Sequence, residues 1–171
     1  MIENERKYLL RGHAVVEASM AALAPGIDIL QGYLDGSSRI RRYLGGGCVW
    51  TVKGYRPDGR NDEDEREITD ARFNEMWPSC KRSLAKRRYK VSDGPDVTWD
   101  VDFFTSPDMS VYFAMAEAEM PEDMEEPPRV LSALGGHVAF LVPRRDMRFS
   151  SSKLCDVAYA SALAAGYGAS S

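Results

Sequence analysis

The sequence is poor in the residues from which zinc sites and disulfide-bonded folds are built. It contains three cysteines and two histidines among 171 residues. Cys48, Cys80 and Cys155 lie far apart and form no CxxC pair, which argues against a disulfide framework and against a zinc cluster. His13 and His137 form no HExxH motif, so zinc chemistry has little support. A reducing compartment is the simplest setting for such a chain, and we expect a cytoplasmic protein.

The chain also lacks an excess of positive charge and a long apolar run. Its 22 Lys and Arg are outnumbered by 26 Asp and Glu, for a formal net charge of −4. A general basic footprint for nucleic acid is therefore absent, and any anionic ligand must be held by a local arrangement of cations. No stretch reaches the roughly 18 consecutive apolar residues that a membrane-spanning helix needs. We expect neither a nucleic-acid partner nor a membrane partner.

What the chain has instead is a series of short segments rich in β-forming residues. Its length suits one domain, which we expect over residues 1–171, with 166–171 as a flexible tail. Strands are predicted over residues 2–10, 27–33, 38–44, 49–55, 63–69, 85–91, 97–104, 111–120 and 138–142. Helices are predicted over 15–24, 71–82, 130–134 and 151–165. This many short strands in one domain favours a barrel or a sandwich.

Charged side chains recur at every second position of these strands. Side chains at positions i and i+2 of a strand share a face. The sets that share a face are Glu3 with Glu5 and Lys7, Arg39 with Arg41, Thr51 with Lys53, Glu63 with Glu65, Lys86 with Arg88, Asp100 with Asp102, and Glu117 with Glu119. On an ordinary antiparallel sheet each set would simply face water. Seven sets with signs sorted by strand favour a closed barrel with a charged interior and helices over its apolar outer face.

A charged interior requires partners for its charges, because desolvating an unpaired charge costs several kcal/mol. Cations would be satisfied by an anionic ligand. Clustered carboxylates raise one another's pKa values unless a metal ion neutralises them. Oxygen ligands of this kind select Mg²⁺ or Mn²⁺ over zinc. A polyphosphate bridged by such an ion satisfies both sets of charges together.

The same residues, taken in chain order, resemble the motifs of a known family. Glu3 to Lys7 resemble ExExK, Gln31 to Leu34 QGYL, Arg39 to Arg41 RxR, Thr51 to Lys53 TxK, Glu63 to Ile68 ExExxI, Phe73 to Pro78 the helix that follows, Lys86 to Tyr89 KxRY, Trp99 to Asp102 WxxD, Ala116 to Glu119 AExE, and Arg148 to Ser150 a C-terminal RFSN. The ordered series, over about residues 2–156, resembles the CYTH superfamily, or triphosphate tunnel metalloenzymes. Within it, the short bacterial inorganic triphosphatases are the most similar. Ser151 departs from the pattern, since the family often has asparagine there.

The resemblance implies an α+β, mainly β fold: an eight-stranded antiparallel closed β-barrel, the triphosphate tunnel, with flanking helices. It implies a bound Mg²⁺ or Mn²⁺ ion and a small-molecule triphosphate substrate, in a monomer or a homodimer. The function implied is hydrolysis of the terminal phosphoanhydride of inorganic triphosphate. The alternatives are a class IV adenylyl cyclase, a thiamine triphosphatase or a nucleoside triphosphatase on the same fold, or a non-catalytic module that binds phosphates or nucleotides.

The resemblance also implies roles for individual residues. The implied metal ligands are Glu3, Glu5, Glu65, Glu117 and Glu119, with Glu63 and Asp102 acting through water or behind the ligands. The implied phosphate-binding residues are Lys7, Arg39, Arg41, Lys53, Arg88 and Arg148. Lys86 would act on the attacking or leaving oxygen. Tyr33 would hydrogen-bond Lys86 and tune it; its alternative role is that of a core aromatic residue.

Overall fold

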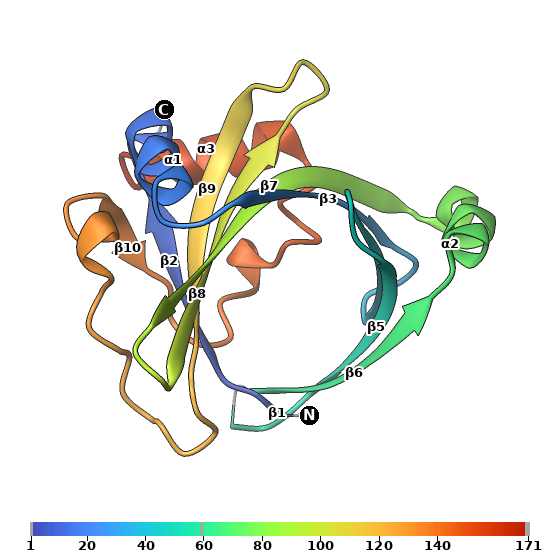
Figure 1. Ribbon diagram of the computed structural model, residues 1–171, viewed down its shortest axis with the longest axis horizontal. Helices are drawn as coiled ribbons and strands as arrows, with labels where there is room; N and C mark the ends of the chain where they lie inside the picture. The colour runs from blue at the N-terminus through green and yellow to red at the C-terminus, as the bar shows by residue number, and fades with distance from the viewer. Residues whose placement is uncertain (1, 59, 170–171) are drawn as a thin grey trace.

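The computed structural model describes residues 2–58 and 60–169. In this part of the chain, the protein is an antiparallel sheet of ten strands with three α-helices and three short 3-10 helices (Figure 1). The strands are β1 (Ile2–Glu3), β2 (Glu5–Leu10), β3 (Gly26–Tyr33), β4 (Ser38–Tyr43), β5 (Cys48–Tyr55), β6 (Asn61–Ile68), β7 (Arg82–Asp93), β8 (Val97–Thr105), β9 (Val111–Glu119) and β10 (Val138–Leu141). The helices are α1 (His13–Ala21), α2 (Asp70–Met76) and α3 (Val157–Gly166), and the 3-10 helices are η1 (Trp77–Ser79), η2 (Ser132–Leu134) and η3 (Met147–Phe149). None of the described helices is long and apolar enough to cross a membrane.

The strand order brings one stretch of chain beside both ends of the sheet. The order is β1-β6-β5-β4-β3-β7-β8-β9-β2-β10. Only Asn4 separates β1 from β2, yet β1 pairs with β6 while β2 pairs with β9. Figure 1 shows the sheet curling round so that these strands meet. The mainly β, α+β class is confirmed. The expected closed barrel of eight strands is not, because the hydrogen-bonded sheet of the described residues has ten strands and ends at β1 and β10.

Asn4 fixes the break between β1 and β2. Its side chain is buried and donates from Nδ2 to the carbonyl oxygens of Pro121, at 2.7 Å, and Met124, at 2.8 Å. Its Oδ1 accepts from Arg144 at 2.8 Å. A buried amide with all these bonds made is held in one orientation. The break is therefore a defined feature that lets the chain leave one neighbour, β6, and join another, β9.

The outer face of the sheet is apolar and is covered by helices, as the alternation predicts. On β8 the outward residues Trp99, Val101 and Phe103 are buried against α1 and the alanines of β9. α2 covers a smaller cluster around Ile40 and Phe73. The charged residues of the same strands consequently point to the inside of the curled sheet.

The inner face is charged at one end of its strands and apolar at the other. On β8 it runs from Asp100 and Asp102 to Phe104, and on β2 it reaches Leu9. Phe104 and Leu9 are fully buried in a cluster with Phe149 of η3 and residues of α3. The C-terminal part of the chain thus fills one end of the interior and leaves the charged end open.

Several element boundaries differ from the sequence predictions. The helix predicted over 71–82 ends at Met76, and Pro78 lies in the 3-10 turn that follows, because proline cannot continue an α-helix. The helix predicted over 151–165 begins at Val157, since Asp156 caps it by accepting from the Tyr159 N–H at 3.0 Å. In the segment expected to be a free tail, Tyr167 stacks on Phe140 and Ala169 is buried. Residues 170–171 of that segment lie outside the described residues.

Candidate functional site

A cavity of about 1440 Å³ opens on the charged inner side of the sheet. Among the described residues, fourteen basic and ten acidic side chains line it. The whole chain carries a formal net charge of −4, so the cavity collects positive charge in a protein that is acidic elsewhere. Clefts lined by one sign of charge concentrate ligands of the opposite sign. The cavity is therefore suited to an anionic ligand.

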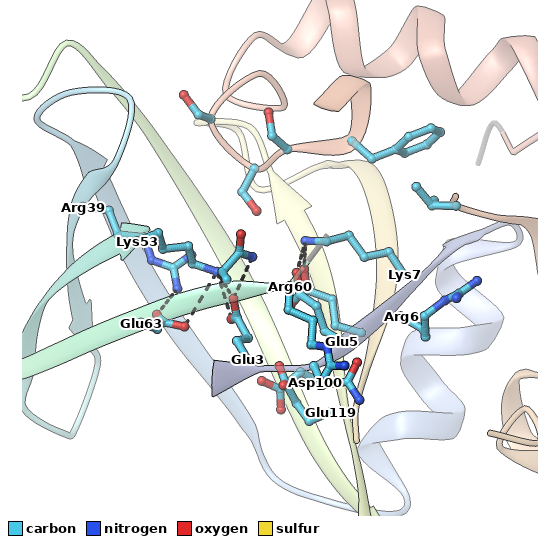
Figure 2. Close-up of a pocket in the computed structure, with 18 of the residues that line it drawn as sticks. Glu3, Glu5, Arg6, Lys7, Arg39, Lys53, Arg60, Glu63, Asp100 and Glu119 are labelled. Carbon is cyan, nitrogen blue, oxygen red and sulfur yellow. Dashed lines mark hydrogen bonds and ion pairs between the residues drawn. The ribbon is translucent and has the colours of Figure 1, made fainter. Parts of the chain in front are cut away.

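One wall of the cavity is a ladder of ion pairs between β4, β5 and β6. Arg39 pairs with Glu63 at 2.9 Å, and Arg41 forms a close ion pair with Glu65. Lys53 reaches across to β1 and contacts Glu3 at 2.6 Å, an arrangement visible in Figure 2. All of these side chains occupy alternate positions on their strands, which explains why they meet on one face. An anion that enters can replace these carboxylates as the partner of each cation.

The facing wall, on β7, β8, β9 and β2, carries a more deeply buried network. Lys86 and Arg88 both contact Asp102, each at 2.6 Å. Arg88 also contacts Glu117 at 3.3 Å, and Lys7 contacts Glu117 at 2.7 Å. Arg88 and Asp100 form a further close ion pair.

The pKa values of the two lysines of this wall, the partly buried Lys7 and the buried Lys86, are shifted in opposite directions. Burial and the neighbouring Arg88 lower the pKa of Lys86 to about 8. Burial also lowers the pKa of Lys7, but the carboxylates of Glu117 and Glu5 outweigh it and leave that pKa raised. Burial alone would raise the pKa of Glu117, yet Lys7 and Arg88 hold it well below the ordinary value. Lys7 and Glu117 thus each favour the charged form of the other, whereas the pKa of Lys86 is lowered towards neutral pH.

Three carboxylates converge beside this network. Ligand oxygens of Glu3, Glu5 and Glu119 all lie within 4.8 Å of one another. Glu5 and Glu119 are directly opposite on β2 and β9, and Glu3 reaches them from β1 across the break at Asn4. Figure 2 shows the group together with Asp100. Two of the three have a lysine, Glu3 with Lys53 and Glu5 with Lys7.

Glu119 is the unbalanced member of this group. Burial, then the charges of Glu5, Glu117 and Glu3, raise its pKa to about 8. No cation of the described residues pairs with it. A carboxylate cluster that retains a proton at neutral pH has the donor chemistry of a hard divalent cation, which would displace that proton. The donor set therefore fits Mg²⁺ or Mn²⁺.

The structure brings together only part of the predicted metal-ligand set. Glu3, Glu5 and Glu119 converge, whereas Glu65 and Glu117 pair with Arg41, Lys7 and Arg88. The two residues expected behind the ligands also pair with cations: Glu63 with Arg39, and the fully buried Asp102 with Lys86 and Arg88.

Most of the predicted phosphate-binding residues line the cavity. Those that do are Lys7, Arg39, Arg41, Lys53 and Arg88. Arg148 does not: its guanidinium lies on Asp146, at 2.6 Å, with the side chain half-exposed. Neighbouring residues explain why Arg148 lies outside the cavity lining. Asp146, the residue before η3, accepts hydrogen bonds from both the backbone N–H and the guanidinium of Arg148.

Tyr33 lines the cavity but does not hydrogen-bond Lys86. Its hydroxyl accepts from Gln31 Nε2 at 2.5 Å, and burial raises its pKa. Across β3 and β7, Tyr33 is opposite Arg82 and Ile29 is opposite Lys86. Four residues along a strand span roughly 13 Å, so the expected hydrogen bond between Tyr33 and Lys86 is wrong.

Sequence reasoning missed a group of cavity residues from the segment after β10. They are Arg144, Arg145, Ser150, Ser151, Ser152 and Lys153, together with Arg82 at the start of β7. The available signal was the run of two arginines after Pro143, which is typical of an exposed turn. The helix predicted over 151–165 would begin with Ser151 and Ser152, whereas these serines lie in a turn and line the cavity.

No family model matches the chain, and no curated protein matches it. Among solved structures the chain is similar to the inorganic triphosphatase NE1496, with 22% identity over 90% of this chain and 93% of that chain and a TM-score of 0.48. It is also similar to PH1819 from Pyrococcus horikoshii OT3, at 17% identity over 71% and 80% of the two chains, with a TM-score of 0.46. A third is the putative adenylyl cyclase HpAC1 from Hippeastrum, described as having a dominant triphosphatase activity, at 15% identity over 70% and 80%, with a TM-score of 0.47. The chemistry of the site rests on the side chains of this chain alone.

Proposed function

We propose that the protein is a metal-dependent triphosphatase that cleaves the terminal phosphoanhydride of inorganic triphosphate. The observation that carries this proposal is the pairing of two features in one cavity. Cations on two facing walls, Arg39 and Arg41 against Lys7 and Arg88, can hold phosphate oxygens from both sides. Beside them lies a carboxylate group whose member Glu119 has no cation among the described residues. Simple anion binding does not require the carboxylates, whereas phosphoanhydride hydrolysis assisted by a divalent ion does.

The proposal includes a tunnel closed by residues 2–10. Because β1 pairs with β6 and β2 pairs with β9, this stretch joins the two walls of the cavity on one side. Such a wall would exclude bulk water from the phosphates while leaving their cations in place. Ion pairs in a sheltered site are stronger than at an open surface. In this arrangement the fixed break at Asn4 allows β1 to pair with one wall and β2 with the other.

Glu3, Glu5 and Glu119 are the residues proposed to hold Mg²⁺ or Mn²⁺. A bound ion of this kind neutralises charge on phosphate oxygens and lowers the pKa of water. The protein's own cations do the rest of the binding, since the guanidinium groups of Arg39 and Arg41 can each make two parallel bonds to a phosphate. Lys86, whose pKa is about 8, can hold or release a proton at Nζ beside the reacting phosphate.

The test is phosphate release from tripolyphosphate, ATP and thiamine triphosphate, each with Mg²⁺ or Mn²⁺ and each repeated with EDTA, alongside an assay for cyclic AMP. We expect metal-dependent release of phosphate from tripolyphosphate. We also expect Glu5→Gln to abolish it, because this change removes one of the three converging carboxylates. Glu75→Gln is the matched control, since among the described residues the ion-pair partner of Glu75 is Arg72, on the exposed face of α2. Cyclic AMP formation, or full activity of Glu5→Gln, would contradict the proposal.

A further inference from the structure

The segment from Pro143 to Lys153 brings unpaired cations to the rim of the cavity. The deep cations of the two walls all have carboxylate partners. By contrast, no carboxylate of the described residues pairs with Arg145, Lys153 or Arg82, although all three line the cavity. The positive charge that the cavity collects therefore belongs largely to its rim and is free to meet a ligand.

Arg145 is held in the cavity lining at a cost to the backbone. The Asp146 N–H donates to the Pro143 carbonyl at 3.1 Å, which makes residues 143–146 a tight turn with Arg145 at its third position. Arg145 has φ 66°, the left-handed conformation that glycine or asparagine usually takes at that position. A residue with a long side chain is strained there, and such strain clusters at ligand sites.

Lys153 and Arg82, the other two rim cations, lie near residues next to Arg145 or next to each other in the chain. Asp146, the next residue, is close enough to Lys153 for that lysine to lower its pKa, after the larger effect of its hydrogen bond with Arg148. Arg82 lies 3.5 Å from the carbonyl and hydroxyl oxygens of Ser152, which precedes Lys153. Arg144, which precedes Arg145, donates a hydrogen bond to Asn4 Oδ1 and so holds the turn beside the break between β1 and β2. The rim is thus anchored next to the carboxylate group.

We propose that Arg145, with Lys153 and Arg82, forms an anion subsite at the rim that contacts a phosphate group of the condensed phosphate held in the cavity. Arg145 thereby supplies the contact that the family resemblance implies for Arg148, whose guanidinium is bound to Asp146 and which is not among the residues that line the cavity. The inference rests on the proposed function for the identity of the anion. It does not depend on hydrolysis.

The variant Arg145→Gly tests this subsite without risk to the fold, because glycine is the residue that the turn prefers. Arg148→Gln is the matched control, an arginine from the same segment that lies outside the cavity. Two quantities are measured for each variant: the KM for tripolyphosphate with Mg²⁺, and the Kd for tripolyphosphate by calorimetry in EDTA. The melting temperature is recorded alongside. We expect Arg145→Gly to raise both KM and Kd about tenfold, because the ligand loses one partly exposed charge-assisted hydrogen bond. The kcat should change little.

Its melting temperature should be equal to or above that of the wild-type protein, and Arg148→Gln should change KM and Kd by less than about twofold. A Kd that is unchanged in Arg145→Gly, or that rises equally in Arg148→Gln, overturns the subsite. If the wild-type protein binds tripolyphosphate but does not hydrolyse it, and Arg145→Gly still weakens binding, the proposed function fails and the subsite stands. Absence of tripolyphosphate binding by the wild-type protein overturns both.

Discussion

Replacing Glu119 with glutamine should stabilise the protein at alkaline pH when no metal is present. Glu119 is the carboxyl of the converging group whose pKa is raised to about 8, by burial and then by Glu5, Glu117 and Glu3. Because its pKa is higher in the folded than in the unfolded chain, the folded state is favoured while Glu119 is protonated. That stability is fully present below the ordinary pKa and is lost as the pH rises towards about 8. Glutamine keeps the shape of the protonated form and never ionises.

The size of the effect follows from the shift in pKa. Each unit of difference in pKa corresponds to about 1.36 kcal/mol. Raising the pKa from 4.5 to about 8 therefore costs at most about 5 kcal/mol on full ionisation. Glu119 is only partly buried, so screening by solvent reduces this cost to about 3 kcal/mol. For a domain of this size, about 3 kcal/mol is about 6–12 °C in melting temperature.

The assay is thermal melting of wild-type protein and Glu119→Gln in EDTA at pH 5 and at pH 8.5. The two should melt together at pH 5, and the variant should melt about 6–12 °C higher at pH 8.5. Adding Mg²⁺ at pH 8.5 should raise the melting temperature of the wild-type protein far more than that of the variant. An equal difference at both pH values, or a variant that is less stable at pH 8.5, would refute the electrostatic reasoning.

Two further predictions concern the framework of the site. Gly32→Ala should destabilise the fold by about 1–3 kcal/mol in urea denaturation, because a Cβ there would lie 2.5 Å from Cys80 Sγ and 2.9 Å from the Trp77 ring. The control is Gly36→Ala, whose added Cβ would have no atom within 4 Å. Equal effects of the two changes would contradict the packing argument. Asp102→Asn should lower the free energy of unfolding by about 3–5 kcal/mol, since it leaves Lys86 and Arg88 buried without their shared carboxylate. The control Glu75→Gln, in an exposed ion pair, should lower it by under about 0.5 kcal/mol. Similar losses in the two variants would be evidence against the buried network.

The side of each strand that faces the cavity could be predicted from the sequence. Alternation places Arg39 and Arg41, or Lys86 and Arg88, on one face whatever the rest of the chain does. Because the opposite face is apolar and buried, a slip by one residue would put the charges in the core, and this fixes the register. Glu3, Glu5 and Glu119, which converge in the structure, belong to the five metal ligands that the family resemblance implies; alternation by itself predicts only that Glu3 and Glu5 share a face.

What could not be predicted depends on contacts between strands and on turns. The register of β3 on β7 separates Tyr33 from Lys86, and no pattern within either strand contains that information. The position of the Arg148 side chain depends on an ion pair with a neighbouring carboxylate, Asp146. A turn with Arg145 in the left-handed conformation places Arg145 in the cavity lining instead. Hydrogen bonds from Asn4 to a loop more than a hundred residues away set the break between β1 and β2.

The pairing of β1 and β2 with different walls has a consequence for how the chain folds during its synthesis on the ribosome. Lys7 and its partner Glu117 are 110 positions apart. At 5–20 residues per second, the partner emerges roughly 5–20 s after the lysine. During that interval β2 has neither of its neighbours and presents bare amide and carbonyl edges, the kind of surface that chaperones cover. Pairing of β2 must therefore wait until residues 111–119 have been made, and nascent chains halted before residue 111 should remain open, protease-sensitive and prone to aggregate.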